Sequence, residues 1–481
     1  MGALPLLRAH VSRPVTTSPR DFETTSLPES LTVLNPATEE VVAEIPTVSP
    51  EQVAVAVERA AKAQQAWAAL APGDRARLLR RFADGVDARI DELADLEVTE
   101  AGHTLGNARW EAGNARDLLE YAAGGVERLI GRQIPVAGGL DVTFHEPLGV
   151  VGVIAPWNFP MPIAAWGFAP ALAAGNAVLL KPAETTPLTA LLLQDIALAA
   201  GLPEGLFQVL PGHGRITGQA IVDHPGVRKI VFTGSTPVGK EIMSRCASGL
   251  KRVTLELGGK SPNIVFADAD LQRAAASAPM AFLDNSGQDC CARTRILVQR
   301  EVYDDFLALV APAIEAVRVG DPRDAATEMG PLISAVQRDR VRSYLTDDVP
   351  VLARGKAPEG PGFWQAPMLL APEDAGCRAA TEEIFGPVAV VLPFDDEADA
   401  LRLANATRYG LSGSLWTRDI GRAVRMARGV NAGNLSVNSH SSVRYWTPFG
   451  GFGESGLGRE LGPDALAHFT ETKNVFISTE D

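Results

Sequence analysis

Three stretches in the first part of the chain carry apolar residues at three- and four-residue spacings, over residues 51–70, 73–96 and 114–129. This spacing puts the apolar side chains on one face of a helix, so it predicts three amphipathic helices. Between residues 132 and 145 the pattern changes to two short extended runs separated by Gly138 and Gly139. Paired glycines between extended runs are typical of a tight turn, and we expect a β-hairpin here.

From residue 149 short apolar runs alternate with helical stretches. The runs predict strands at 149–155, 176–181, 207–210, 229–232 and 253–257, and the stretches between them predict helices at 162–174, 187–200, 214–222 and 238–248. Such alternation implies right-handed crossovers and a parallel sheet that helices cover on both faces. The first half is therefore predicted to be a doubly wound α/β unit.

A second α/β series follows. It predicts strands at 294–299, 387–393, 412–416 and 433–437 and helices at 301–317, 397–406 and 420–429, with loops at 319–331 and 354–368. Residues 471–478 form a last extended run with no partner close in the sequence. An unpaired strand of this kind favours pairing with another subunit.

Composition and charge exclude several classes of function. The chain has 481 residues, 46% of them hydrophobic, and 44 Lys and Arg against 58 Asp and Glu, for a formal net charge of −14. An acidic chain without a long basic run is not expected to bind nucleic acid or anionic lipid. The longest uncharged stretch, residues 147–180, contains four prolines and several glycines. We therefore expect it to be buried core and not a membrane span.

Four cysteines, Cys246, Cys290, Cys291 and Cys377, are too few for a disulfide scaffold. They suit a reducing compartment, and we expect a cytoplasmic protein. The first twenty residues contain arginines and no acid, which faintly resembles a transit peptide. We favour a flexible head over residues 1–25.

Candidate chemistry begins at Cys290, in the polar turn of residues 287–291 before a predicted strand. A thiolate there could reach a ligand, although a cysteine taken alone is more often a small, inert buried hydrophobe. Glu256 ends an apolar strand and is followed by two glycines. Burial disfavours the charge of such a carboxylate and makes it a possible general base, or else a structural group bonded to backbone amides.

Asn158 lies in a proline-bounded turn at the carboxyl end of a predicted parallel strand. Its amide could stabilise an oxyanion, or it could simply favour the turn. Lys181 and Glu184, at the end of the next strand and just after it, could bond ribose hydroxyls. The pattern of residues 232–239 predicts a strand, a glycine turn and the start of a helix, which together could bind a pyrophosphate.

No histidine lies in a stretch that resembles a paired general base, and no Cys/His pair has ligand spacing. Neither a cysteine hydrolase nor a metal site is therefore expected.

These residues carry a family resemblance: from about residue 30 to its end the chain resembles the aldehyde dehydrogenase superfamily, in its hydrolytic branch that does not form acyl-CoA. The match rests on motifs in the family's order: Pro156-Trp157-Asn158-Phe159-Pro160, Lys181-Pro182-Ala183-Glu184, Leu255-Glu256-Leu257-Gly258-Gly259-Lys260, Gly287-Gln288-Asp289-Cys290, Glu382-Glu383-Ile384-Phe385-Gly386-Pro387, and Pro448-Phe449-Gly450-Gly451 with Gly458-Arg459-Glu460.

The resemblance implies Cys290 as nucleophile, Glu256 as general base and Asn158 as oxyanion donor. The thioester would then be hydrolysed, because members that transfer the acyl group to coenzyme A generally lack this glutamate. It implies NAD as cofactor, with NADP less favoured because a glutamate on the ribose repels a 2′-phosphate. The residues implied to bind it are Pro156, Trp157, Lys181, Ala183, Glu184, Gly234, Ser235, Leu257, Glu383 and Phe385.

The resemblance also implies an α/β fold with a Rossmann-like cofactor domain (26–131 and 147–257) and a second α/β catalytic domain (258–466). A small β arm (132–146 and 467–481) would form homodimers or homotetramers. A catalytically silent member reused for binding is the alternative of a different class, and the intact Cys290, Glu256 and Asn158 argue against it.

Two departures from the family pattern bear on function. Trp166 is followed by Gly167 where members often have lysine, which puts in doubt a proton relay toward Glu471.

The loop before Pro448 carries Arg444, and its charge suggests a polar aldehyde with a carboxylate or glutamyl end. Arg444 could equally pair with an acid such as Asp289. An aminoaldehyde or betaine aldehyde remains open, as does a broad aliphatic or aromatic range. The candidate substrate residues are Trp166, Asp289, Cys291, Arg444 and Phe449.

Overall fold

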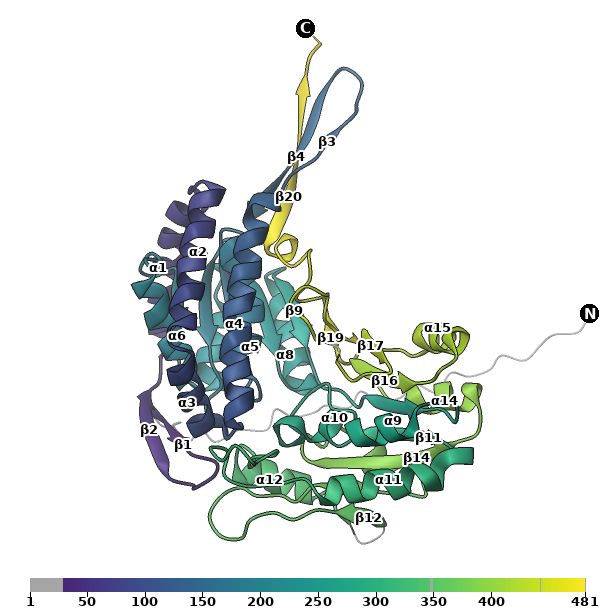
Figure 1. Cartoon of the computed structure of the whole chain (residues 1–481). Helices are drawn as coiled ribbons and strands as arrows, with labels where there is room; N and C mark the ends of the chain where they lie inside the picture. The colour runs from purple at the N-terminus through teal and green to yellow at the C-terminus, as the bar shows by residue number, and fades with distance from the viewer. Residues whose placement is uncertain (1–28, 347–348, 442, 481) are drawn as a thin grey trace, which may run out of the picture.

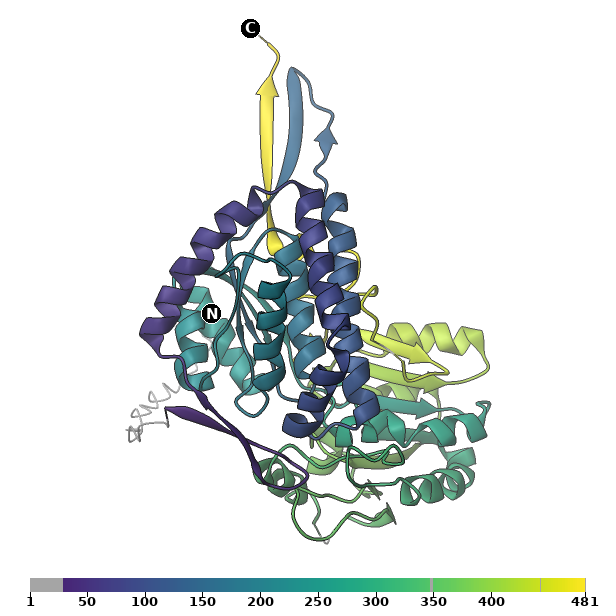
Figure 2. The same cartoon turned by 60° about the vertical axis from the view of Figure 1, so that its left-hand side comes forward.

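The computed structural model describes residues 29–346, 349–441 and 443–480. The chain forms two α/β lobes, and a narrow β arm projects from the first (Figures 1 and 2). The head expected over residues 1–25 lies outside the described residues. Among the described helices, none is long and apolar enough to cross a membrane.

The first lobe begins with a hairpin that the sequence pattern did not predict, β1 (Ser30–Leu34) and β2 (Val41–Pro46). Four helices follow: α1 (Pro50–Ala68), α2 (Pro72–Asp87), α3 (Ile90–Ala101) and α4 (Leu105–Gly125). Ser49 caps α1 reciprocally with Gln52, which fixes its start. The expected helix over 73–96 is two helices, because the chain leaves helical geometry at Arg89.

The first sheet has the order β19-β9-β8-β5-β6-β7, and its pairs are parallel except for β19 with β9. Its strands are β5 (Val150–Ile154), β6 (Ala177–Lys181), β7 (Phe207–Val209), β8 (Val227–Thr233), β9 (Arg252–Glu256) and β19 (Gly456–Leu457). From β5 the chain runs outward to β6 and β7, then returns to β8 on the other side. The point between β5 and β8 is therefore the topological switch point, where open α/β sheets bind ligands at the carboxyl ends of their strands.

Helices cover both faces of this sheet (Figure 1). Helices α5 (Pro160–Ala173) and α6 (Leu188–Ala199) pack on one face, and α1, α7 (Gln219–Asp223) and α8 (Thr236–Ser248) pack on the other. Every residue of α5 is buried, because α4 covers the side that faces away from the sheet. This explains why the uncharged stretch around residues 147–180 belongs to the core.

The second lobe contains a seven-stranded sheet of order β12-β13-β14-β11-β10-β16-β17, parallel except for β12 with β13. Its strands are β10 (Pro262–Val265), β11 (Arg295–Gln299), β12 (Val351–Arg354), β13 (Met368–Leu370), β14 (Val388–Phe394), β16 (Ser412–Trp416) and β17 (Asn434–Val437). Its helices are α9 (Leu271–Ser277), α10 (Met280–Leu283), α11 (Tyr303–Glu315), α12 (Ala335–Arg342), α13 (Arg378–Thr381), α14 (Glu397–Ala404) and α15 (Ile420–Gly429). The four strands predicted here are present. The short strands β10, β12 and β13 were not predicted.

The arm is a three-stranded antiparallel sheet of order β20-β4-β3, made by β3 (Gln133–Ile134), β4 (Gly139–Pro147) and β20 (Thr470–Ser478). The tail strand has a partner within its own chain, since β20 pairs with β4 along its whole length, from Thr470 with Pro147 to Ser478 with Gly139. The partner is distant in the sequence and belongs to the stretch 132–146, which the family resemblance grouped with the tail in one arm. In the described chain the other edge of β20 is unpaired.

Residues 443–469 leave the second lobe and return to the first. Phe449, Leu461 and Phe469 are buried in the first lobe's core, and β19 joins its sheet. Another short strand of the segment, β18 (Phe452–Gly453), pairs with β15 (Tyr409–Gly410). The segment therefore connects the two lobes. The family resemblance placed most of it in the second, catalytic domain, over residues 258–466.

Candidate active site

Two cavities meet at Cys290, where the carboxyl ends of the first sheet face the second lobe. The first, of about 170 Å³, brings together residues that both lobes contribute: Pro156, Trp157, Asn158, Thr233, Gly234, Ser235, Glu256, Leu257, Gly258, Cys290, Gln337, Arg340, Glu383 and Phe385. The second, of about 310 Å³, includes Trp110, Phe159, Trp166, Asp289, Cys290, Cys291 and Phe449. Cys290 lines both cavities.

A strained turn presents Cys290. Asn285, Ser286 and Gly287 all have positive φ, of 48°, 57° and 70°. A Cβ on Gly287 would lie 2.2 Å from the carbonyl oxygen of Gly386, so only glycine fits at this position. Left-handed residues in series cost free energy, and folds retain them where the surrounding structure fixes a functional conformation.

The side chain of Asn158 is held beside the nucleophile. It follows β5, and its Nδ2 donates to the carbonyl oxygen of Gln288, 2.9 Å away. Asn285 in turn donates from its side chain to the backbone oxygen of Asn158. These bonds fix the Asn158 amide next to the loop that carries Cys290, where it can donate its second N–H to a reacting oxygen.

The Cys290 thiol is surrounded by groups that favour its neutral form. Its pKa is raised well above the usual value by a hydrogen bond with Cys291 and by burial. Burial also raises the pKa of Asp289 to about 6, although the Cys291 N–H donates to its Oδ1 at 2.8 Å. The thiol is therefore protonated at neutral pH and must lose its proton when it reacts.

Glu256 is buried at the end of β9, and neither of its carboxylate oxygens has a hydrogen-bond partner among the described residues. Its pKa is raised well above the usual value, first by burial and then by the charge of Glu460. Burial raises the pKa of Glu460 to about 8, against the opposing charge of Lys229. A carboxyl of this kind accepts a proton near neutral pH, as a general base requires.

Glu460, and not Glu471, is the carboxylate coupled to Glu256. Glu471 lies at the base of the arm, where it is exposed and bonded to Arg252. Sequence reasoning quoted Glu460 in a motif but gave it no role. Gly167 packs against Val153, where a Cβ would lie 2.8 Å from a methyl group, so a lysine there would need the core to shift.

On the cofactor side, Glu383 reaches across from the second lobe and accepts a hydrogen bond from the Gly259 N–H at 2.8 Å. Burial raises its pKa to about 7. A Cβ on Gly258 would lie 2.3 Å from a Glu383 oxygen, so this glycine permits the close approach. Phe385 has a φ of 61°, and its ring meets that of Trp157 at a centroid distance of 5.2 Å, edge to face.

Further along the crevice, Ser235 is exposed at the start of α8, and its side chain does not cap the helix. The first N–H groups of this 13-residue helix can therefore bind an anion.

Lys181 is buried and donates to the oxygen of Pro182 at 2.7 Å; burial lowers its pKa to about 8. Glu184 accepts from the Gly214 N–H at 2.9 Å. Lys181 ends β6, Ala183 and Glu184 follow it, and none of the three is in the lining of the first cavity.

Four of the five predicted substrate residues line the second cavity: Trp166, Asp289, Cys291 and Phe449. The rings of Trp166 and Phe449 lie 5.0 Å apart, and Trp110 and Phe159 add two more aromatic walls. Arg444 is the exception. It is exposed, donates to Ser441 Oγ at 3.3 Å, and enters neither the cavity nor an ion pair with Asp289.

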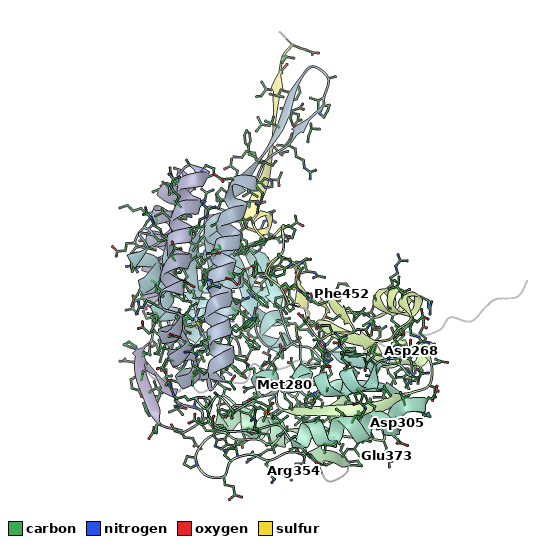
Figure 3. All side chains as sticks on the ribbon, viewed as in Figure 1. Asp268, Met280, Asp305, Arg354, Glu373 and Phe452 are labelled. Carbon is green, nitrogen blue, oxygen red and sulfur yellow. The ribbon has the colours of Figure 1, made fainter. Side chains whose placement is uncertain are left out.

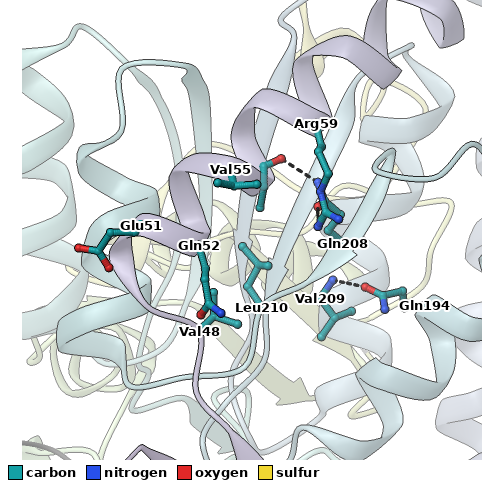
Figure 4. Close-up of a pocket in the computed structure, with 10 residues that line it drawn as sticks. Val48, Glu51, Gln52, Val55, Arg59, Gln194, Gln208, Val209 and Leu210 are labelled. Atoms are coloured by element: carbon teal, nitrogen blue, oxygen red, sulfur yellow. Dashed lines mark hydrogen bonds between the residues drawn. The ribbon is translucent and has the colours of Figure 1, made fainter.

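A buried Glu/His cluster and a further cavity lie outside this site. Glu97, His103 and Glu111 are buried in the helical layer, with His103 Nδ1 2.5 Å from a Glu111 oxygen and 3.4 Å from a Glu97 oxygen. A cavity of about 480 Å³ lies between α1 and the edge strand β7 (Figure 4). Its polar side chains serve the fold, since Arg59 bonds Gln208 and Gln194 accepts from the Val209 N–H.

Comparison with known proteins agrees with this geometry. Residues 22–475 match the model of the aldehyde dehydrogenase family. Betaine aldehyde dehydrogenase 1 of Rhizobium meliloti is 42% identical over 451 residues, covering 92% of each chain. Phenylacetaldehyde dehydrogenase of Pseudomonas fluorescens is 42% identical over 466 residues, covering 94% of this chain and 93% of its own.

The NAD+ complex structure of aldehyde dehydrogenase from Bacillus cereus superposes with a TM-score of 0.92 at 38% identity, covering 94% of each chain. The resemblance drawn from the motifs and the predicted α/β fold are confirmed. The chain belongs to the aldehyde dehydrogenase family.

Proposed function

We propose that this chain oxidises an aldehyde to the carboxylic acid, with NAD as electron acceptor and water as second reactant. The observation that supports this most directly is the position of Cys290, which lines both the cofactor-side cavity and the aromatic cavity. Aldehyde, water and NAD+ would be consumed, and acid, NADH and a proton released.

In the first step, Cys290 Sγ bonds to the aldehyde carbon and the thiol proton leaves. The former carbonyl oxygen becomes an alkoxide, which the Asn158 amide and the Cys290 backbone N–H stabilise. A hydrogen-bond donor aimed at a developing oxyanion commonly increases kcat by a factor of about 10²–10³.

When bound, NAD accepts hydride from that carbon, and Cys290 is left as a thioester. Glu256 then takes a proton from a water molecule, which attacks the thioester carbon. The C–S bond breaks, the carboxylic acid is released, and the proton held by Glu256 returns to the Cys290 thiolate. The raised pKa of Glu256 suits it to accept this proton near neutral pH.

The residues present fit a dinucleotide. Glycines at 234, 258 and 259 let a ligand approach the backbone, the start of α8 can bind the pyrophosphate, and Glu383 with Phe385 flanks the place of the nicotinamide ribose and ring. Lys181 and Glu184 would bind the adenosine ribose. A carboxylate at that ribose disfavours a 2′-phosphate, so we propose NAD over NADP.

The second cavity supports an aldehyde with a bulky aromatic or cationic tail. Four aromatic side chains, Trp110, Phe159, Trp166 and Phe449, contribute to its walls. The relatives named for betaine aldehyde and phenylacetaldehyde carry tails of these two kinds. The hypothesis of a carboxylated semialdehyde or glutamyl substrate depends on Arg444, which is not among the residues that line this cavity.

NADH formation from NAD and an aldehyde panel, ranked by kcat/KM, tests the proposal. We expect turnover that Cys290→Ser abolishes while NAD binding is retained. Absence of turnover on every aldehyde, with NAD still bound, would instead favour a silent member of the family.

We also propose that the arm joins subunits into a homodimer or homotetramer. The unpaired edge of β20 lies beside exposed Phe144, Phe476 and Ile477, which favours burial against another copy. Sedimentation of the full chain tests this, and a monomer at micromolar concentration would refute it. The four free cysteines suit a reducing compartment such as the cytoplasm.

A further inference from the structure

We propose that Asp284 makes the substrate cavity selective for aldehydes whose tail carries a positive charge, as a quaternary or protonated ammonium. This inference rests on the proposed function and names the residue that recognises the tail. Asp284 comes directly after α10 and lines the second cavity with Met280, which is half-exposed where the two lobes meet (Figure 3).

The carboxylate of Asp284 is held in place by one of its oxygens. Oδ1 accepts a hydrogen bond from Asn107 Nδ2 at 2.8 Å and another from the Asn285 N–H at 3.0 Å. No donor among the described residues bonds Oδ2. The side chain is therefore fixed by neutral groups, with one oxygen available to a ligand.

The other charged groups of the cavity do not neutralise Asp284. Arg293 also lines the cavity, and its guanidinium is held by bonds to Ser414 Oγ at 2.8 Å and to the backbone oxygens of Cys291 and His440. Its positive charge acts on neighbouring Asp289, so these two opposite charges offset one another. None of the ion pairs between described residues includes Asp284.

His440 adds no positive charge to the cavity. Its Nδ1 lies 2.9 Å from Ser414 Oγ and its Nε2 lies 3.3 Å from Ser277 Oγ. Burial and the charge of Arg293 lower its pKa to about 3, so the ring is neutral. The negative charge of Asp284 is thus in excess on the cavity wall.

The aromatic walls complete a site for an onium group. A cation over an aromatic face is attracted to it, more strongly once water is displaced. Trp110 stands at the exposed rim, on the helix that also carries Asn107, so one helix supplies both an aromatic wall and the group that positions Asp284. An uncharged tail would fit the same rings but would bring no opposite charge to the carboxylate.

A matched pair of aldehydes isolates the effect of charge. Betaine aldehyde and 3,3-dimethylbutanal have the same shape and differ by nitrogen for carbon at the tail. We expect the chain to prefer betaine aldehyde in kcat/KM. We expect Asp284→Asn to reduce that preference roughly fivefold, as the loss of a partly exposed charge pair would, because kcat/KM for betaine aldehyde falls by more than kcat/KM for 3,3-dimethylbutanal.

Two controls accompany the variant. Asp305→Asn removes an exposed acid on α11 (Figure 3), so it reports any effect of net charge alone and should leave the preference unchanged. Asp284→Glu keeps the charge and should restore part of the preference.

An equal loss on both aldehydes in Asp284→Asn would assign the residue a structural role and overturn the inference, as would a wild-type chain that does not distinguish them. In either case turnover of the neutral aldehyde would leave the proposed function standing. Turnover of neither aldehyde would count against the proposed function itself.

Discussion

Replacing Asn158 with alanine tests the proposed chemistry most directly. The change removes the side-chain amide that lies beside the Cys290 loop, without touching Cys290 or Glu256. Loss of one oxyanion donor costs about 3–4 kcal/mol of transition-state stabilisation, so kcat should fall by about 10²–10³. The cost in folding stability should be smaller, about 1 kcal/mol, because a single neutral hydrogen bond to the Gln288 oxygen is lost.

The two effects are separated by measuring NADH formation under saturating aldehyde and the free energy of unfolding of the same preparation. Asn158→Asp is a useful companion, because it keeps the size of the side chain but replaces the donor with an acceptor, and it should be no more active than alanine. A kcat within tenfold of wild type, or a loss of stability large enough to explain the lost activity, would refute the reasoning.

Three further predictions follow from the same geometry. Glu256→Gln should keep the rapid first formation of NADH but slow the steady state, because thioester hydrolysis loses its base; equal loss of both phases in stopped-flow would contradict this. Glu460→Gln removes a charge that raises the pKa of Glu256, so the acid limb of the pH–rate profile should move to lower pH, while Glu471→Gln should leave it unchanged. Gly287→Ala should destabilise the fold by more than about 1 kcal/mol, from a left-handed φ of 70° and a contact with the Gly386 oxygen; unchanged thermal unfolding would count against it.

Much of the fold could be predicted because each signal was local. The strands of both sheets stood out as short apolar runs, and alternation with helices implied parallel pairing. The errors fall where packing overrides the pattern. The stretch 73–96 has the pattern of one helix but forms two, and β10, β12 and β13 lie in stretches where the pattern predicted no strand. The extended pattern of the tail strand could not by itself reveal its partner, because β4 lies more than three hundred residues away in the chain, and only the family resemblance grouped the two stretches.

The candidate site likewise combines features that local motifs predict with features that only packing decides. Motifs placed Cys290, Glu256 and Asn158 at strand ends and turns, and the sheet topology brings such ends together. Arg444 was a candidate for either a substrate contact or a structural role; it bonds Ser441 and does not line the cavity, because side-chain direction in an irregular loop follows from packing that no spacing predicts. Asp284 showed no sequence signal, since a lone acid beside a short helix is usually a solvated group.

The sequence by itself determined the class of fold, the family and the three residues proposed for the chemistry, because short motifs fix local turns and place reactive side chains at their ends. The tertiary structure alone decided which carboxylate raises the pKa of Glu256, the register in which β20 pairs with β4, and which charges line the substrate cavity. Those outcomes depend on contacts between elements distant in the chain, where burial and electrostatic fields are set by every neighbour at once.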